Sequence, residues 1–174
     1  MIDAIIAGMS PTATRAMVID FTEYYYLCDM VVVVKKDGAY ANAASLADFA
    51  GAKITGQLGT SHYLMIDQIP GVQKMTAMDT FPDMIVALQN NIVDGYMADR
   101  PGALSATVAN PDLTFAAFPE GQGFDVDMDE VSVSVGLQKG SALLAPMNEA
   151  LAAIPQAERD EIMESVLKRQ PLSE

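Results

Sequence analysis

Cysteine and histidine are almost missing from this sequence, because each occurs once, as Cys28 and His62. A single cysteine forms no internal disulfide, and one cysteine with one histidine is too few for a zinc site built on those residues. The same scarcity excludes a cysteine nucleophile served by several histidines. We therefore expect Cys28 to be a small buried hydrophobic residue beside Leu27, and we predict no metal and no other cofactor.

Cations and long apolar runs are scarce as well. The chain has 10 lysines and arginines against 23 aspartates and glutamates, a formal net charge of −13. Such a surface repels phosphate backbones and anionic lipids, which argues against a nucleic-acid partner. The longest uncharged aliphatic stretch, residues 30–34, is far shorter than the roughly 20 residues of a membrane span. The first residues do not resemble a cleavable signal sequence, and we expect them to belong to the middle of a domain.

What the sequence does contain is strand-like and helix-like segments in alternation. The strand-like segments are residues 3–7, 30–34, 53–57, 73–78, 94–98, 113–118 and 131–137. With a hydrophobic content of 51%, these segments can bury a core. Strands that alternate with helices predict an α/β fold with mainly parallel sheets.

Three helical patterns separate or follow these strands. The first begins at Thr80, with Asp83 three residues later in a capping-box-like arrangement. Its apolar stripe, at roughly helical spacing, consists of Phe81, Ile85, Leu88 and Ile92. The two C-terminal stripes are Leu143, Leu144, Met147, Leu151 and Ile154, and then Ile162, Met163, Val166 and Leu167.

Polar side chains follow three of the strand-like segments. The first loop contains Ser10, Thr12 and Arg15, the second is the stretch LGTSHY at residues 58–63, and the third contains Asp99. In open α/β sheets, the loops at the carboxyl ends of strands form the ligand crevice. We therefore expect these loops to line a binding site.

The chemistry of the three loops suits a zwitterion. The planar guanidinium of Arg15 can take a carboxylate through two hydrogen bonds. Residues 59–61 precede a predicted helix, whose first N–H groups also favour an anion. Asp99 favours a cation. A free α-amino acid is the commonest small molecule that carries both charges.

Each feature also has a purely structural interpretation. Arg15 could pair with Asp20 or Glu23 on the surface, and residues 59–61 could simply cap a helix. Asp99 could cap the helix that follows it, and we expect His62 to lie on a helix surface. The combination of the three loops is what favours a binding site.

Four stretches, in consistent order and spacing over nearly the whole chain, resemble family 3 of the bacterial solute-binding proteins. They are GMSPTATRAMVIDFTEYYY, SLADFAGAKITGQLGTS, ALQNNIVDGYMAD and VSVGLQKGSALLAPMNEAL. The family comprises amino-acid receptors of ABC importers with a type II periplasmic-binding fold. The resemblance implies a periplasmic or cell-surface protein that binds an amino acid between two lobes, delivers it to a permease and has no enzymatic activity.

The resemblance also implies a role for individual residues. Arg15 would clamp the ligand carboxylate, helped by Ser10 and Thr12. Thr60 and Ser61 would assist from the other lobe, the latter through its hydroxyl and amide. Asp99 would accept the α-ammonium group, with the backbone near Met9 and Ser10 as a further contact.

The resemblance further implies two lobes with a two-stranded hinge at residues 24–28 and 131–134. One lobe would comprise residues 1–27 and 132–174, and the other residues 28–131. Two other functions remain open: a ligand-sensing domain of a receptor or sensor kinase, which a membrane span after Glu174 would favour, and a dehydratase-like enzyme that uses His62 and Asp99.

The family's opening βαβ segment has no counterpart in this sequence, so the first lobe is expected to be incomplete. Either the sequence is a fragment, or a partner or a swapped copy supplies the missing part. A half-built lobe leaves a sheet edge and an apolar face uncovered. We therefore predict self-association through this lobe.

Overall fold

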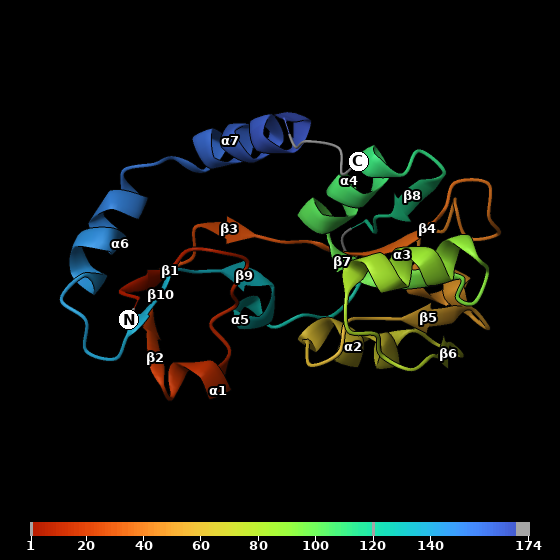
Figure 1. Ribbon diagram of the computed structural model, residues 1–174, viewed down its shortest axis with the longest axis horizontal. Helices are drawn as coiled ribbons and strands as arrows, with labels where there is room; N and C mark the ends of the chain where they lie inside the picture. Colours follow the sequence, from red (N-terminus) through yellow and green to blue (C-terminus); the bar gives the residue numbers. More distant parts are fainter. Residues whose placement is uncertain (1, 120, 170–174) are drawn as a thin grey trace. The chain divides into compact units, whose positions relative to one another are not determined.

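The computed structural model describes residues 2–119 and 121–169 (Figure 1). The chain forms two compact units. Unit 1 comprises the chain up to Cys28 together with Val126–Arg169, and unit 2 comprises Asp29–Asp125. Unit 1 is therefore discontinuous in sequence. The lobe limits at residues 1–27, 28–131 and 132–174 stay a prediction.

Unit 2 is built around a five-stranded sheet with the strand order β6-β5-β7-β4-β8. Its strands are β4 (Met30–Lys35), β5 (Lys53–Thr55), β6 (Gln73–Lys74), β7 (Gly95–Asp99) and β8 (Leu113–Ala116). β5 runs parallel to β6 and β7, whereas β4 runs antiparallel to β7 and β8. β4 is an inner strand of this sheet, and its apolar run is buried.

The helices of unit 2 connect these strands. They are α2 (Ser61–Met65), α3 (Phe81–Gln89) and α4 (Arg100–Ala109), with the 3-10 helices η1 (Leu46–Phe49) and η2 (Ile66–Gln68). α3 begins as predicted, since the Thr80 hydroxyl accepts a hydrogen bond from the backbone N–H of Asp83. Pro82 follows in the first turn, where a helix does not need the missing N–H.

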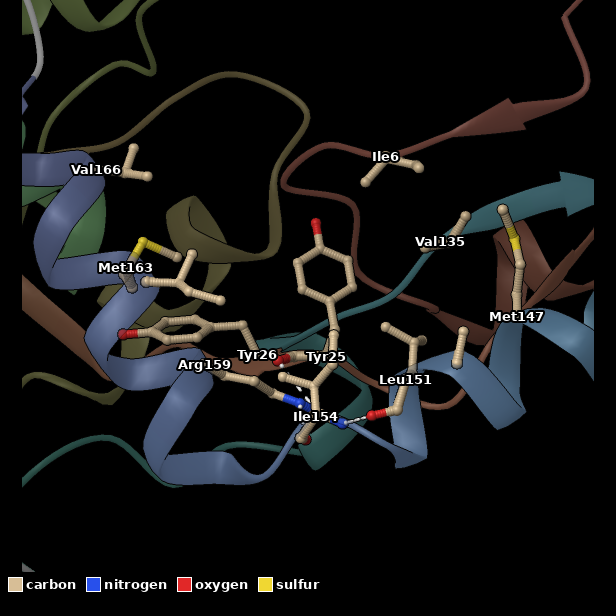
Figure 2. A pocket seen from close by; sticks show the side chains of 12 residues that line it. Ile6, Tyr25, Tyr26, Val135, Met147, Leu151, Ile154, Arg159, Met163 and Val166 are labelled. Carbon is tan, nitrogen blue, oxygen red and sulfur yellow. Dashed lines mark hydrogen bonds between the residues drawn. The ribbon is translucent and has the colours of Figure 1, made fainter.

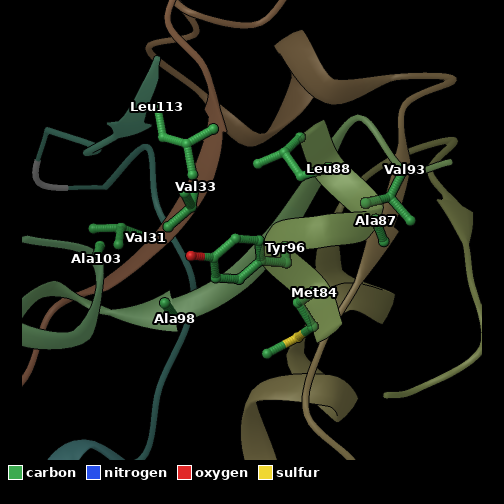
Figure 3. Close-up of a cluster of buried hydrophobic side chains, with 10 residues drawn as sticks. All are labelled: Val31, Val33, Met84, Ala87, Leu88, Val93, Tyr96, Ala98, Ala103 and Leu113. Atoms are coloured by element: carbon green, nitrogen blue, oxygen red, sulfur yellow. The ribbon is translucent and has the colours of Figure 1, made fainter. Parts of the chain in front are cut away.

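A hydrophobic core joins α3 and α4 to one face of the unit 2 sheet (Figure 3). Its buried members are Val31, Val33, Met84, Ala87, Leu88, Val93, Tyr96, Ala98, Ala103 and Leu113. The Tyr96 ring lies at the centre of this group, and its hydroxyl has no hydrogen-bond partner among the described residues. Burial raises the pKa of Tyr96 above its ordinary value, so this side chain stays neutral.

The predicted apolar stripe of α3 is wrong at its end. Leu88 is buried, but Ile92 is 55% exposed. α3 ends before Asn91, which adopts a left-handed backbone conformation with φ of 59°, so Ile92 lies outside the helix. Met84 and Ala87 are buried, although the predicted stripe did not include them.

Unit 1 contains two small sheets. β1 (Ala4–Ile5), β10 (Gly136–Gln138) and β2 (Ile19–Phe21) form one, in that order, and β3 (Tyr26–Leu27) pairs antiparallel with β9 (Ser132–Val133) to form the other. The helices are α1 (Ala13–Ala16), α5 (Met128–Val131), α6 (Leu144–Ala152) and α7 (Gln156–Arg169). The two segments predicted to cross between the lobes are thus hydrogen-bonded to each other. Cys28, beside β3, is buried as predicted.

The α/β class of the fold and its mainly parallel sheets are confirmed, with one antiparallel strand inserted in each of the two larger sheets. β1 and β2 run in the same direction, as strands joined by a helix do. β10 inserts antiparallel between them, and β4 inserts antiparallel between β7 and β8. Each of these two inserted strands comes soon after the chain has crossed from one unit to the other. Local sequence patterns do not reveal such a crossing. No helix among the described residues is long and apolar enough to cross a membrane.

Candidate functional site

Arg15 lies in α1, and its side chain is exposed. Its Nη1 atom donates a hydrogen bond to the backbone carbonyl of Ser10 at 3.0 Å. This hydrogen bond closes the loop between the two residues and holds the guanidinium in place. It uses one of the five N–H donors of the guanidinium. The remaining donors can bind a carboxylate.

Arg15 does not form the surface ion pair considered as its alternative role. Among residues 2–119 and 121–169, no ion pair involves Arg15. Asp20 pairs instead with Lys139 at 2.8 Å and accepts a hydrogen bond from the Gly140 N–H. These two contacts hold the pKa of Asp20 below its usual value. The guanidinium is thus positioned without being neutralised by a carboxylate of the described chain.

The other predicted residues of unit 1 lie on the same loop. Thr12 is the N-cap residue of α1, but its side chain makes no capping hydrogen bond. The Met9 carbonyl accepts a hydrogen bond from the Ser134 N–H at 3.0 Å, which ties this loop to the segment between β9 and β10. Met9, Ser10, Thr12 and Arg15 are therefore brought together in unit 1.

The second loop lies in unit 2, between β5 and α2. Gly59 has φ of +75°, a conformation that favours glycine. The Thr60 hydroxyl donates to the Gln57 carbonyl at 2.8 Å and does not cap α2. Ser61 is the first residue of α2. Residues 59–61 therefore form the turn before α2. The Thr60 hydroxyl does not cap the helix, which was the structural role considered for this stretch.

Asp99 ends β7 and is the N-cap residue of α4. Its Oδ1 atom accepts a hydrogen bond from the Gly102 N–H at 2.6 Å. The capping role considered from the sequence is therefore real, and it uses one of the two carboxylate oxygens. The charge and the second oxygen can still serve a cation.

β5 and β7 are neighbouring parallel strands, with Thr55 opposite Tyr96. The loop after β5 and the end of β7 therefore emerge at the same edge of the sheet, so Thr60, Ser61 and Asp99 are brought together in unit 2. Arg15 and Asp99 belong to different units. No cluster of three metal-ligating side chains occurs among the described residues.

His62 is not the surface residue expected from the sequence. Its side chain is largely buried, and its Nδ1 atom has no hydrogen-bond partner within the described chain. Burial lowers the pKa of His62, and the negative charge of Asp99 opposes that effect. Periodicity could not reveal this, because α2 has only five residues.

The sequence also gave no sign of an apolar pocket of about 420 Å³ in unit 1 (Figure 2). We call it the unit 1 pocket; its lining residues are Ile6, Tyr25, Tyr26, Val135, Met147, Ala150, Leu151, Ile154, Arg159, Ile162, Met163 and Val166. Several of them come from the predicted C-terminal stripes, although the side chain of Leu167 lies outside the described residues.

The polar groups of the unit 1 pocket are engaged within the protein. Arg159 donates to the carbonyls of Ile154, Leu151 and Tyr24. The Tyr25 hydroxyl donates to the Ala7 carbonyl at 2.7 Å, and burial raises the pKa of Tyr25. Such a pocket does not suit a zwitterion, because a charge transferred to apolar surroundings needs a partner there. The polar loops of the two units, and not this pocket, therefore hold the candidate residues for a charged ligand.

The chain is thus an α/β protein of two units, each of which carries a polar loop with a charged side chain. The family model of bacterial extracellular solute-binding proteins, family 3, matches residues 1–168. The chain belongs to this family.

Among curated proteins, the chain is 33% identical over 161 residues to the ABC transporter arginine-binding protein 1 of Escherichia coli (strain K12), covering 87% of this chain and 60% of that protein. It is 30% identical to the probable histidine-binding protein of Campylobacter jejuni subsp. jejuni serotype O:2, covering 74% and 50%. A third relative, the arginine-binding extracellular protein ArtP of Bacillus subtilis (strain 168), is 25% identical, with 86% and 56% covered. The chain thus spans between half and three fifths of the length of these relatives.

Solved structures agree with the family. The substrate-binding protein of an amino acid ABC transporter superposes with a TM-score of 0.74 at 28% identity, covering 97% of this chain and 72% of that one. An amino acid ABC transporter substrate-binding protein from Streptococcus pneumoniae Canada MDR_19A, bound to L-arginine, has a TM-score of 0.77 at 25% identity, with 95% and 68% covered. An ancestral arginine-binding protein bound to arginine has a TM-score of 0.71 at 28% identity, with 94% and 71% covered.

Proposed function

We propose that this chain binds a free α-amino acid and delivers it to an ABC-type importer at the cell surface or in the periplasm, without catalysis. The observation that carries the proposal is the exposed guanidinium of Arg15, which Ser10 positions and which no carboxylate of residues 2–119 and 121–169 neutralises. In a chain with a net charge of −13, an arginine left in this state points to an anion from outside. The family, and its arginine-binding and histidine-binding relatives, support an amino acid, with arginine and histidine as the first candidates.

The proposed roles follow the chemistry of each group. Arg15 takes the α-carboxylate through two N–H donors, and the hydroxyls of Ser10, Thr12 and Ser61 add hydrogen bonds, with Thr60 shaping the turn. Asp99 takes the α-ammonium with the carboxylate oxygen that does not cap α4. The Met9 carbonyl can accept one more hydrogen bond from the ammonium besides that from Ser134.

A thermal-shift panel of the twenty amino acids tests this function. A ligand present at about 100 times its dissociation constant adds about 2.7 kcal/mol to the stability of the native form. For a chain of this size, we expect the melting temperature to rise by about 5–10 °C for the cognate amino acid. The N-acetyl and carboxamide derivatives of that amino acid are the controls, because each removes one of the two charges. Equal shifts with these derivatives, or no shift with any amino acid, would contradict the proposal.

We also propose that the chain associates with a second copy of itself through the unit 1 pocket. Three residues that line it are largely exposed: Ile6 at 68%, Ile162 at 51% and Val166 at 50%. Apolar residues gathered in this way favour association. The net charge of −13 opposes contact between copies, so added salt should strengthen association by screening that repulsion.

Sedimentation velocity over a range of protein and salt concentrations tests the self-association. We expect a dimer that becomes more populated with salt, and we expect Ile162→Asp to return the chain to a monomer. Val108→Asp is the matched control, because Val108 lies on α4 of unit 2 and is equally exposed, at 51%. A monomeric parent chain, or equal effects of the two substitutions, would rule out the unit 1 pocket as the interface.

A further inference from the structure

His62 is an unusual residue in unit 2, because the described structure gives its Nδ1 atom no hydrogen-bond partner although that atom is buried. Buried polar atoms normally have partners, so one without a partner calls for an explanation. A proton added to this imidazole would increase the charge in a poorly solvated place, and burial accordingly lowers the pKa of His62 below 6.5. The side chain is therefore neutral at neutral pH and gains its charge only at a lower pH than an exposed imidazole does.

The position of His62 links it to Asp99. His62 lies in α2, which follows β5 and contacts β7, and Asp99 is the last residue of β7. In β7, Asp99 points to the face of the sheet opposite to the core residues Tyr96 and Ala98, because successive side chains of a strand alternate. Asp99 is also the charged group that acts on the imidazole.

The other charged groups on the neighbouring elements have partners of their own. Asp67 of η2, which packs against α2, pairs with Lys74 of β6 at 2.8 Å. Arg100, next to Asp99, lies 3.7 Å from the carboxylate of Asp29. Asp99 is therefore the charged group with which a protonated His62 would interact.

We propose that the protonation of His62 controls the strength of the Asp99 subsite. The inference rests on the proposed function, in which Asp99 takes the α-ammonium of an amino acid. Neutral imidazole leaves the carboxylate of Asp99 to the ligand. Imidazolium supplies a competing positive charge beside the same carboxylate, and it repels the ammonium that arrives there.

The direction of the effect follows from linkage. A ligand that places an ammonium on Asp99 removes the negative charge that favours imidazolium, so binding lowers the pKa of His62 further. Reciprocally, protonation of His62 weakens binding by the same factor. Affinity is therefore highest above the pKa of the ligand-free chain and falls as the pH drops through the interval between the free and the bound pKa.

An NMR titration of the imidazole C–H signal in the 174-residue chain tests this, first without ligand and then with saturating L-arginine. The chain has one histidine, so the signal belongs to His62 without further assignment. We expect L-arginine to lower the pKa by about one pH unit, which corresponds to about a tenfold weaker affinity for the protonated form. Calorimetry at about pH 8 and about pH 5 should show the matching loss of affinity.

Two variants make the test specific. In Asp99→Asn, the pKa of His62 should fall in the ligand-free chain, because the carboxylate charge is gone. In His62→Gln, L-arginine should bind as in the parent at about pH 8, with the affinity loss at about pH 5 removed.

The inference is overturned if L-arginine binds while the pKa of His62 stays constant, or if His62→Gln retains the full pH dependence. Failure of L-arginine to bind at about pH 8 would instead count against the proposed function. In that case, a pKa of His62 that is the same in ligand-free Asp99→Asn as in the parent would show that His62 and Asp99 are not coupled.

Discussion

Replacement of Arg15 by alanine is expected to weaken amino-acid binding by about 2–4 kcal/mol, or about 30- to 800-fold. The loss is large because the ligand carboxylate would still be desolvated in the site but would lack its charged partner. Folding should change little, since the side chain is exposed and its described hydrogen bond is the one to the Ser10 carbonyl. Isothermal titration calorimetry with the amino acid selected by the thermal-shift panel measures the change.

Two further variants separate charge from geometry at this position. Arg15→Lys keeps the positive charge but loses the planar fork, so it should bind with intermediate affinity. Lys36→Ala removes one positive charge from an exposed position of unit 2 and should leave affinity unchanged. An Arg15→Ala chain that binds as tightly as the parent would show that the carboxylate is held elsewhere.

Much of the fold could be predicted from short patterns in the sequence. The apolar run of β4 predicted a buried strand, and Thr80 with Asp83 predicted the start of α3, because both signals depend on residues close together in the chain. These patterns missed β2, since a strand of three residues carries little periodicity, and β3 was expected only as part of the hinge that the family resemblance implied. The insertion of β10 between β1 and β2 is a pairing between residues more than one hundred positions apart, as between Leu137 and Asp20. No local pattern encodes such a pairing.

The candidate site shows the same division. The charges at Arg15 and Asp99 could be read from the sequence, because the loops that follow strands form the ligand crevice of open α/β sheets. The contacts that each group makes within the folded chain could not be read from the sequence. The bond from Arg15 to the Ser10 carbonyl, the Thr60 hydroxyl held by Gln57, and the burial of His62 beside Asp99 all depend on how the loops are folded.

The second large effect is expected at Asp99, which caps α4 and is the proposed partner of the α-ammonium group. Asp99→Ala should lose about 2–4 kcal/mol of binding free energy together with about 1 kcal/mol of folding stability. The first loss comes from the missing partner of the α-ammonium. The second comes from the Gly102 N–H at the start of α4, which loses its acceptor at 2.6 Å. Calorimetric titration and urea unfolding measure the two quantities separately.

Asp99→Asn distinguishes the two roles, because its amide oxygen can still accept the hydrogen bond from Gly102 while the negative charge is gone. Its stability should therefore stay near that of the parent, and its affinity should fall nearly as far as that of Asp99→Ala. Thr80→Ala is the matched control, since it removes the cap of α3 in the same unit and should lower stability by about 1 kcal/mol with binding intact. If Asp99→Asn bound the amino acid like the parent, Asp99 would be a helix cap and not the ammonium partner.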